Sequence, residues 1–229
     1  MADTLSALKN CELFQGISDN ILLEHVLPCG HVQEYQKGQF LVIPLQRLEH
    51  LGLILSGKVQ ILHIFADGHY SLMNVLDSED ILAIDLVCTK KQLSPYHAMA
   101  TTNVQIFWIP VTLLTQSGRI GEADRLRCMH NMLLLIADEN MKKEYRLAIL
   151  SQKGLRERII SYLMMQSSRR RKTTFAISFS REELAAYLCV NRSALSHELS
   201  LMEEEGLISF RKNVFSLLSL AEQNQYLSL

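Results

Sequence analysis

The sequence lacks the features that mark a membrane-spanning, secreted or disulfide-stabilised protein. None of its apolar runs approaches the roughly 20 residues that cross a bilayer, and residues 1–14 have no basic segment followed by an apolar one. Its five cysteines are an odd number and include no CxxC spacing, which disfavours disulfides and a zinc or iron-sulfur cluster of local ligands. These absences predict a cytoplasmic protein with packing thiols and no membrane partner.

Signatures of catalysis are missing as well. The chain has no G-x-S-x-G elbow, no Walker loop and no H-E-x-x-H zinc motif. A cupin-like metal enzyme needs a close His-x-His pair with a following glutamate, and His63 and His69 are too far apart to imitate it. We therefore expect no enzyme and no metal site.

What the chain does contain is a pair of short amphipathic helices within residues 180–208. Ser180 and Glu183 have the spacing of a capping box, which predicts the start of the first helix, and Asn191 can cap the second. Gly206 suits the left-handed position that ends the second helix. The predicted buried faces comprise Leu184, Ala185 and Leu188, then Leu195, Leu199 and Met202.

The outer face of the second helix would carry short polar side chains, one arginine and one histidine, as a DNA recognition helix does. An ordinary helical hairpin with a polar solvent face is the alternative interpretation. The predicted face comprises Arg192, Ser193, Ser196, His197 and Ser200.

Segments on both sides of the helix pair strengthen the DNA-binding interpretation. Residues 208–210 and 214–217 read as two strands of a hairpin with Arg211 and Lys212 at its tip, which fits a wing. The cationic run 169–172 precedes an alternating strand at 175–179 and is either a solvated loop or a phosphate contact. Arg181, at the start of the first helix, completes the predicted DNA-binding set together with Arg211 and Lys212.

The charges divide unevenly along the chain. Residues 151–229 contain eleven Lys and Arg against eight Asp and Glu, a balance of +3, whereas residues 1–150 have a balance of −4. The total of −1 permits DNA binding without indicating it, because a dimer can gather its cations on one face.

The N-terminal part reads as short strands separated by turns. We expect strands at 40–43, 51–55, 59–65, 70–76 and 104–109, with turns at Gly38, Gly57, Asp67-Gly68 and Asp77-Ser78. Such a pattern is typical of a small antiparallel barrel or sandwich that encloses a pocket.

A long helix is expected between the two parts, and its heptad spacing predicts a homodimer. Asn140 falls at an a position, where a buried polar pair fixes register. Packing of this stripe on the barrel is the alternative. The predicted seam comprises Leu126, Met129, Leu133, Ile136, Asn140, Lys143, Leu147 and Leu150.

In this order of parts the chain resembles the Crp/Fnr superfamily of bacterial transcription regulators. The segments that carry the resemblance are residues 13–17, Lys37-Gly38, residues 54–59, Asp67-Gly68, residues 156–159 and the helix pair at 180–208. The resemblance implies an α+β fold with an N-terminal β-roll like a cyclic-nucleotide-binding domain (1–118), a long dimerisation helix (119–150) and a winged helix-turn-helix domain (151–229).

The resemblance also implies a function. The protein would be an effector-linked dimer that binds a palindromic promoter site in double-stranded DNA and, as an activator, RNA polymerase. Arg192 would be the family's arginine at the head of the recognition helix. Many members have glutamate where this chain has Ser193 and arginine where it has His197, so a different half-site is expected.

The effector is the least defined expectation. Residues 78–100, where cyclic-nucleotide-binding members hold the phosphate, contain no arginine, which disfavours cyclic AMP. Cys11 and Cys29 are too far apart for the family's iron-sulfur cluster, and His63, His69, His97 and His130 leave haem open. A small organic ligand would be lined by Ile81, Ile84, Leu86, Tyr96, His97, His130 and Leu134.

A second functional class remains open at this stage. A dimeric β-roll signalling or interaction module would have the same parts but no specific DNA site. Specific binding to a two-fold DNA site distinguishes the two.

Overall fold

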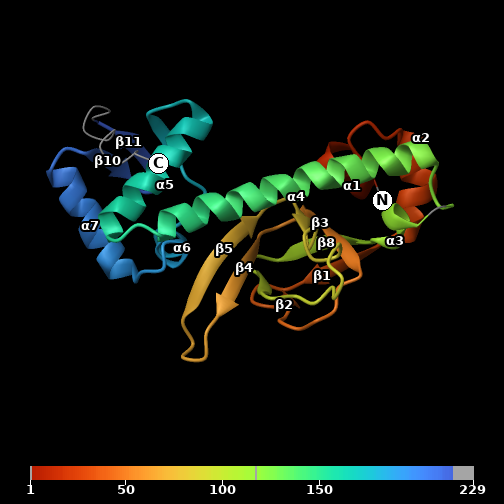
Figure 1. Cartoon of the computed structure of the whole chain (residues 1–229), viewed down its shortest axis with the longest axis horizontal. Helices are drawn as coiled ribbons and strands as arrows, with labels where there is room; N and C mark the ends of the chain where they lie inside the picture. The colour runs from red at the N-terminus through yellow and green to blue at the C-terminus, as the bar shows by residue number, and fades with distance from the viewer. Residues whose placement is uncertain (1, 117, 219–229) are drawn as a thin grey trace. The chain divides into compact units, whose positions relative to one another are not determined.

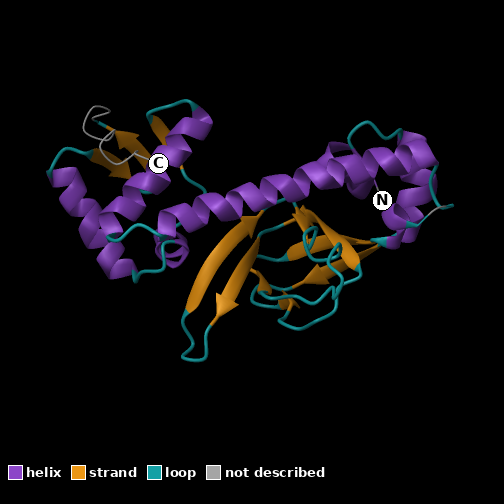
Figure 2. Cartoon of the chain, in the orientation of Figure 1, coloured by secondary structure: helices purple, strands orange, loops and turns teal. Residues whose placement is uncertain are grey.

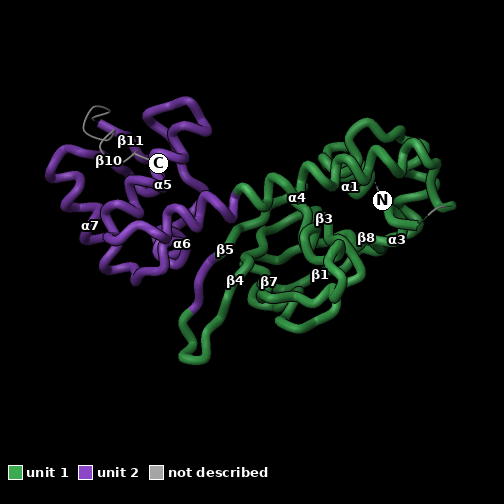
Figure 3. Tube along the Cα trace, in the orientation of Figure 1, with its two compact units in different colours: residues 1–69, 73–141 green, residues 70–72, 142–229 purple. Residues whose placement is uncertain are grey.

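The computed structural model describes residues 2–116 and 118–218, with side chains from residue 4 onward. The chain forms two compact units, drawn in different colours in Figure 3. Unit 1 comprises residues 1–69 and 73–141, and unit 2 comprises residues 70–72 and 142–229.

Unit 1 is built around two four-stranded sheets with antiparallel pairing (Figures 1 and 2). One sheet has the order β1-β8-β3-β6 and the other β2-β7-β4-β5, so every pair of neighbouring strands except β4 and β5 is non-consecutive in sequence. The strands are β1 (His31–Tyr35), β2 (Phe40–Val42), β3 (His50–Ser56), β4 (Val59–Ile64), β5 (Tyr70–Leu76), β6 (Ile81–Leu82), β7 (His97–Ala100) and β8 (Val104–Pro110).

The predicted strands are confirmed, and sequence reasoning missed three others. The segments predicted at 40–43, 51–55, 59–65, 70–76 and 104–109 correspond to β2, β3, β4, β5 and β8, with ends that differ by a residue or are unchanged. The missed strands are β1, β6 and β7.

The turns use glycine where the backbone requires it. Gly57 lies between β3 and β4 with a φ of 90°, and a Cβ there would lie 2.3 Å from the carbonyl oxygen of Asn103. Any other residue would therefore push the β3–β4 hairpin away from the segment that leads into β8.

Short helices flank the sheets of unit 1. They are α1 (Ala2–Asn10), the 3-10 turns Glu12–Phe14 and Leu27–Cys29, α2 (Asp19–Ile21), a π turn (Leu22–Val26) and α3 (Thr112–Thr115). None of these was predicted. Leu8, Leu13 and Phe14 bury their side chains in the same core as the strands, so the N-terminal segment completes the roll.

The long helix α4 (Glu122–Leu150) starts slightly later than the predicted 119–150. Cys128 and Met132 are buried in the core of unit 1, and Ile136 packs against it. Ile136 therefore contacts the roll rather than lying fully on a free seam. Leu126, Leu133 and Leu147 are more than half exposed, and Asn140 is exposed.

Unit 2 contains the predicted helix pair and hairpin. Its three-stranded sheet has the order β10-β11-β9. The strand expected at 175–179 is shorter, because after Ala176 only the Ile177 N–H continues the pairing, to the carbonyl oxygen of Asn213. The elements are α5 (Leu155–Arg170), β9 (Thr174–Ala176), α6 (Arg181–Tyr187), α7 (Arg192–Glu204), β10 (Ile208–Arg211) and β11 (Val214–Leu217).

Candidate nucleic-acid interface

The first helix of the pair, α6, begins as its sequence predicts. The Glu183 N–H donates to Ser180 Oγ at 3.2 Å, and the Ser180 N–H donates to Glu183 Oε2 at 2.7 Å. This reciprocal capping box satisfies backbone donors that the first turn leaves without helical partners. The start of α6 is therefore fixed locally.

A tight turn joins α6 to α7. Cys189 has a φ of 58°, a left-handed conformation that side chains disfavour. The Val190 N–H donates to the carbonyl oxygen of Ala185 at 3.0 Å, which closes the end of α6. The chain then re-enters a helix at Asn191, whose side chain accepts from the Ala194 N–H at 2.7 Å. The predicted cap of α7 is confirmed.

The helix α7 buries one face completely. Leu195, Leu199 and Met202 have no exposed surface, and Gly206 follows the helix with a φ of 75°. The 3.6-residue period then directs the remaining side chains away from this core. The two faces are thus those predicted from the sequence.

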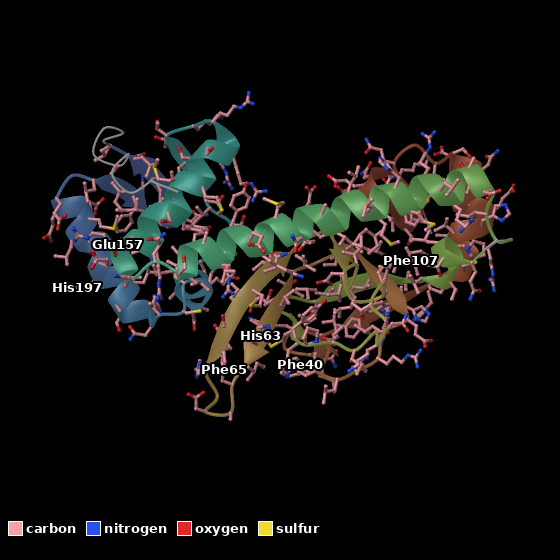
Figure 4. All side chains as sticks on the ribbon, viewed as in Figure 1. Phe40, His63, Phe65, Phe107, Glu157 and His197 are labelled. Atoms are coloured by element: carbon pink, nitrogen blue, oxygen red, sulfur yellow. The ribbon has the colours of Figure 1, made fainter. Side chains whose placement is uncertain are left out.

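The outer face of α7 carries the predicted recognition residues. Arg192, Ser193, His197 and Ser200 are exposed, Ser196 is half-buried, and Figure 4 labels His197 on this helix. The Ser193 hydroxyl donates to Asn191 Oδ1 at 2.8 Å, and the Ser200 hydroxyl donates to the carbonyl oxygen of Ser196 at 3.1 Å. No carboxylate occurs within residues 192–197, so the first turns present donors and hydroxyl oxygens without a negative charge.

An arginine of α5 fixes the position of α7, and sequence reasoning did not identify it. Arg156 Nε donates to Glu198 Oε1 at 2.6 Å, while its two terminal nitrogens contact both carboxylate oxygens of Glu205 at 2.6 and 2.9 Å. The carboxylates of Glu205 and Glu198 raise the pKa of Arg156 above its usual range. Arg156 thus joins α5 to the middle of α7, at Glu198, and to its C-terminal end, at Glu205.

At its C-terminal end, α6 packs against an aromatic cluster through Tyr187. The Tyr162 ring of α5 lies 5.5 Å from that of Tyr187, and the Phe179 ring lies 5.1 Å from Tyr187. Burial raises the pKa of both tyrosines. These contacts place α5 and α6 so that α7 has a rigid support.

The hairpin of β10 and β11 exposes the two predicted cations at its tip. Arg211 and Lys212 are exposed, and the cationic run 169–172 is exposed too. Arg181, which is predicted to contact DNA, has its guanidinium against the hairpin, where it donates to the carbonyl oxygen of Lys212 at 3.2 Å. The guanidinium also lies over the rings of Phe210 and Phe215, at 4.9 and 5.5 Å.

The residues predicted to line an effector pocket lie in different environments. Ile84, Leu86 and Tyr96 are buried in the core of unit 1, and Ile81 packs against that core. Burial and the carboxylates of Asp85 and Glu139 raise the pKa of Tyr96. His97 is half-buried with its ring 5.3 Å from Phe40, whereas His130 and Leu134 are exposed on α4. Four of the predicted residues therefore belong to or pack on the core of unit 1, whereas His130 and Leu134 face outward from α4.

The histidines considered for haem are also dispersed. His69 forms a short contact with Asp67 and stacks on Phe65 at the tip of the β4–β5 hairpin. His63 lies on β4 (Figure 4). Within residues 2–116 and 118–218, no three His, Cys, Asp or Glu side chains gather as metal ligands would, and no helix has the length and apolar character of a membrane span.

Comparison with known domain families agrees with this division. The Crp-like helix-turn-helix domain matches residues 157–222, and the cyclic nucleotide-binding domain matches residues 32–116. These two domains, in this order and joined by α4, define a transcription regulator with a helix-turn-helix DNA-binding domain. The chain belongs to the Crp/Fnr family.

Individual relatives share the fold at low sequence identity. The global nitrogen regulator of Synechococcus elongatus is 20% identical over 201 residues, which are 84% of this chain and 89% of the relative. FixK2 from Bradyrhizobium japonicum superposes with a TM-score of 0.64 at 16% identity, covering 86% of this chain and 96% of that one. A CooA mutant from Carboxydothermus hydrogenoformans gives a TM-score of 0.69 at 17% identity, covering 87% and 88%.

Proposed function

We propose that the protein is an effector-responsive homodimer that binds a two-fold symmetric promoter site, with α7 in the major groove and the wing on the flanking backbone. The observation that carries this proposal is the outer face of α7. Its exposed polar residues stand on a helix whose other face is completely buried and whose position is fixed by Arg156. Two such helices would read half-sites about 34 Å apart, one turn of DNA.

Arg192 is the residue proposed to read a base, because its exposed guanidinium can form two hydrogen bonds to guanine O6 and N7. We expect Arg192→Ala to weaken binding to a selected duplex by about 1 to 3 kcal/mol, with little change on a scrambled duplex. Titrations of both duplexes at one salt concentration measure this. Equal losses on both would contradict a base-reading role.

Ser193 and His197 are proposed to distinguish this site from those of relatives with glutamate and arginine at these positions. A serine hydroxyl and an imidazole reach less far than those side chains and make single hydrogen bonds. Selection of binding sequences from a random pool, repeated with Ser193→Glu and His197→Arg, tests this. An unchanged selected sequence in both variants would contradict it.

Dimerisation is proposed to use the exposed apolar side chains of α4. Leu133 is 64% exposed on this helix, an arrangement that a second copy would cover. We expect Leu133→Glu to give a monomer in sedimentation experiments, whereas the control Leu23→Glu, at an exposed leucine that does not belong to α4, leaves the dimer intact. A dimer in both variants would contradict the seam.

Asn140 is proposed to face its counterpart across the dimer axis. A polar pair at this position costs stability but selects two strands in one register. Oligomeric state and cross-linking register in Asn140→Leu test it. An unchanged dimer with unchanged register would refute the role.

The effector is proposed to be a small molecule other than cyclic AMP. Residues 78–100 contain no arginine, and the Ser94 hydroxyl is already engaged with the backbone of Tyr96. Identification of any molecule that co-purifies is the first test, and an absorbance scan after haem reconstitution tests the haem alternative. Activation would add RNA polymerase as a partner, and repression would not.

A further inference from the structure

We infer that Arg181 is a positioning residue that holds the wing, and that it does not itself contact DNA. This inference rests on the proposed DNA-binding function. Its basis is the combination of contacts made by one guanidinium at the start of α6. It donates to the Lys212 carbonyl oxygen at 3.2 Å and lies over the rings of Phe210 and Phe215. All three partners belong to the β10–β11 hairpin.

The wing tip needs such a support because its turn is strained. Arg211 pairs with Val214, so only Lys212 and Asn213 form the turn. Lys212 has a φ of 56°, a conformation that glycine normally supplies. On the other side, Asn213 Nδ2 donates to the carbonyl oxygen of Ile177 at 2.8 Å, and the Ile177 N–H donates to the Asn213 carbonyl oxygen at 2.9 Å. The tip is therefore held from two directions.

A cleft of about 460 Å³ lies between the wing tip and the start of α6. Its lining combines the polar residues Ser178, Ser180, Lys212 and Asn213 with the apolar residues Ile177, Phe179, Leu184 and Phe215. In this open region, the Arg181 guanidinium is the side chain of α6 that reaches the Lys212 carbonyl. Without it, the exposed cations Arg211 and Lys212 would keep their charge but lose a fixed location.

The electrostatic environment favours the same assignment. Burial, and then the neighbouring charge of Arg192, lowers the pKa of Arg181. Two ring faces and a carbonyl oxygen compensate a partly desolvated guanidinium better than they would an ammonium, because the planar group can stack and donate at once. Swinging this side chain out to a phosphate would remove three contacts from the wing. Arg181 thus differs from Arg211 and Lys212, whose side chains are exposed.

A double-mutant cycle separates the two roles. The probe is a duplex that the wild-type protein selects from a random pool. We expect Arg181→Gln to weaken binding about tenfold, an effect of the size of a lost backbone contact, and Arg181→Lys to weaken it nearly as much. In the wing-neutralised background Arg211→Gln/Lys212→Gln, Arg181→Gln should add less than about twofold, because coupled residues are not additive.

A direct phosphate contact predicts the opposite results. It would give a full tenfold loss again in the neutralised background and substantial rescue by lysine, which keeps the charge. Either result would overturn the inference.

Hydrogen exchange in the DNA-free protein gives an independent readout. Arg181→Gln should speed exchange of the amides in residues 209–216 by about tenfold or more, whereas the neutralised wing alone should not. Unchanged exchange in Arg181→Gln would refute the positioning role even if DNA binding fell. If the wild-type protein selects no duplex, the proposed function fails, while the exchange experiment still decides whether Arg181 holds the wing. Arg181→Lys provides a second variant should the glutamine variant not fold.

Discussion

In the roll, the ion pairs lie at the surface, whereas in the DNA-binding unit several arginines contribute to the internal structure. Arg47 and Lys58 of unit 1 pair with carboxylates while their side chains remain 66% and 48% exposed. In unit 2, Arg146 is 9% exposed and donates to Ser71 and to the Tyr187 carbonyl oxygen. Arg158 donates to the carbonyl oxygens of Gln152 and Leu188.

This contrast changes the meaning of the positive balance in residues 151–229. Arg156, Arg158 and Arg181 already bind carboxylates, carbonyl oxygens or rings within unit 2. The cations that remain exposed are Lys153, those of the run 169–172, Arg192, Arg211 and Lys212. A count of charges overstates the cations available to phosphates, because arginine is also a structural residue here.

The contrast predicts the largest loss of stability in the roll core. Ile106 on β8 is fully buried, so we expect Ile106→Ala to lower the free energy of unfolding by about 2 to 5 kcal/mol. Trp108, the single tryptophan of the chain, reports this transition by fluorescence in denaturant. Gln105→Ala, at an exposed neighbour on the same strand, is the control. A loss below about 1 kcal/mol would show that the roll does not depend on apolar burial as supposed.

A smaller loss is expected in unit 2 when its arginine fork is removed. Arg156→Ala leaves two carboxylates without their partner, and we expect it to lower the free energy of unfolding by about 2 kcal/mol. This loss is smaller than for a fully buried ion pair, because the side chains of Arg156 and Glu205 are 29% and 46% exposed. Circular dichroism follows the helices of both units, while Trp108 fluorescence follows the roll, so a melting transition that only circular dichroism detects is assigned to unit 2. Arg156→Lys keeps the charge without the fork and should lose less. An unshifted melting curve in the alanine variant would show that Arg156 does not stabilise unit 2, and would contradict the structural role given to its arginines.

A difference in stability between two variants is expected at Cys189, where the turn between α6 and α7 has a φ of 58°. Cys189→Gly and Cys189→Ala both lose the Sγ contacts with Ser71 and Arg146, but only glycine relieves the disfavoured conformation. The glycine variant should therefore be more stable than the alanine variant by up to about 1 kcal/mol. Cys189→Ala keeps the Cβ and is the control. Equal stability of the two variants would mean that the turn is not strained.

The smallest effect concerns thiol reactivity, which compares exposure within both units. At about pH 8, a thiol reagent should modify the exposed Cys88 and Cys189 of the native protein but not Cys11 or Cys128. Burial raises the pKa of Cys11 to about 11 and of Cys128 to about 12. Unfolded thiols ionise first, so the folded state should lose stability as the pH rises from about 9 towards 11. Modification of all thiols at equal rates would contradict this burial.

The fold was predictable from the sequence where local signals determine it. The caps at Ser180 and Asn191 and the end at Gly206 depend on residues within a turn of each other. The strand β1 was not predictable, because its side chains are nearly all exposed and show no alternation, and β7 contains no β-branched residue. Both strands form because β8, β2 and β4 offer edges that only the folded roll provides.

The candidate site shows the same division. The outer face of α7 follows from helical period alone, and all five predicted residues are exposed or half-buried there. The roles of Arg156 and Arg181 depend on partners 42 and 31 residues away, which no local pattern indicates. Their contacts distinguish structural arginines from exposed ones, and that distinction required the tertiary structure.

The bonds between Asn213 and Ile177 have a thermodynamic consequence for the proposed complex. They order the wing tip while the protein is free, so the conformational entropy of that hairpin is lost during folding and not during association. Docking on DNA would then show a heat-capacity change set by the buried surface alone, without the added contribution of a segment that folds on binding.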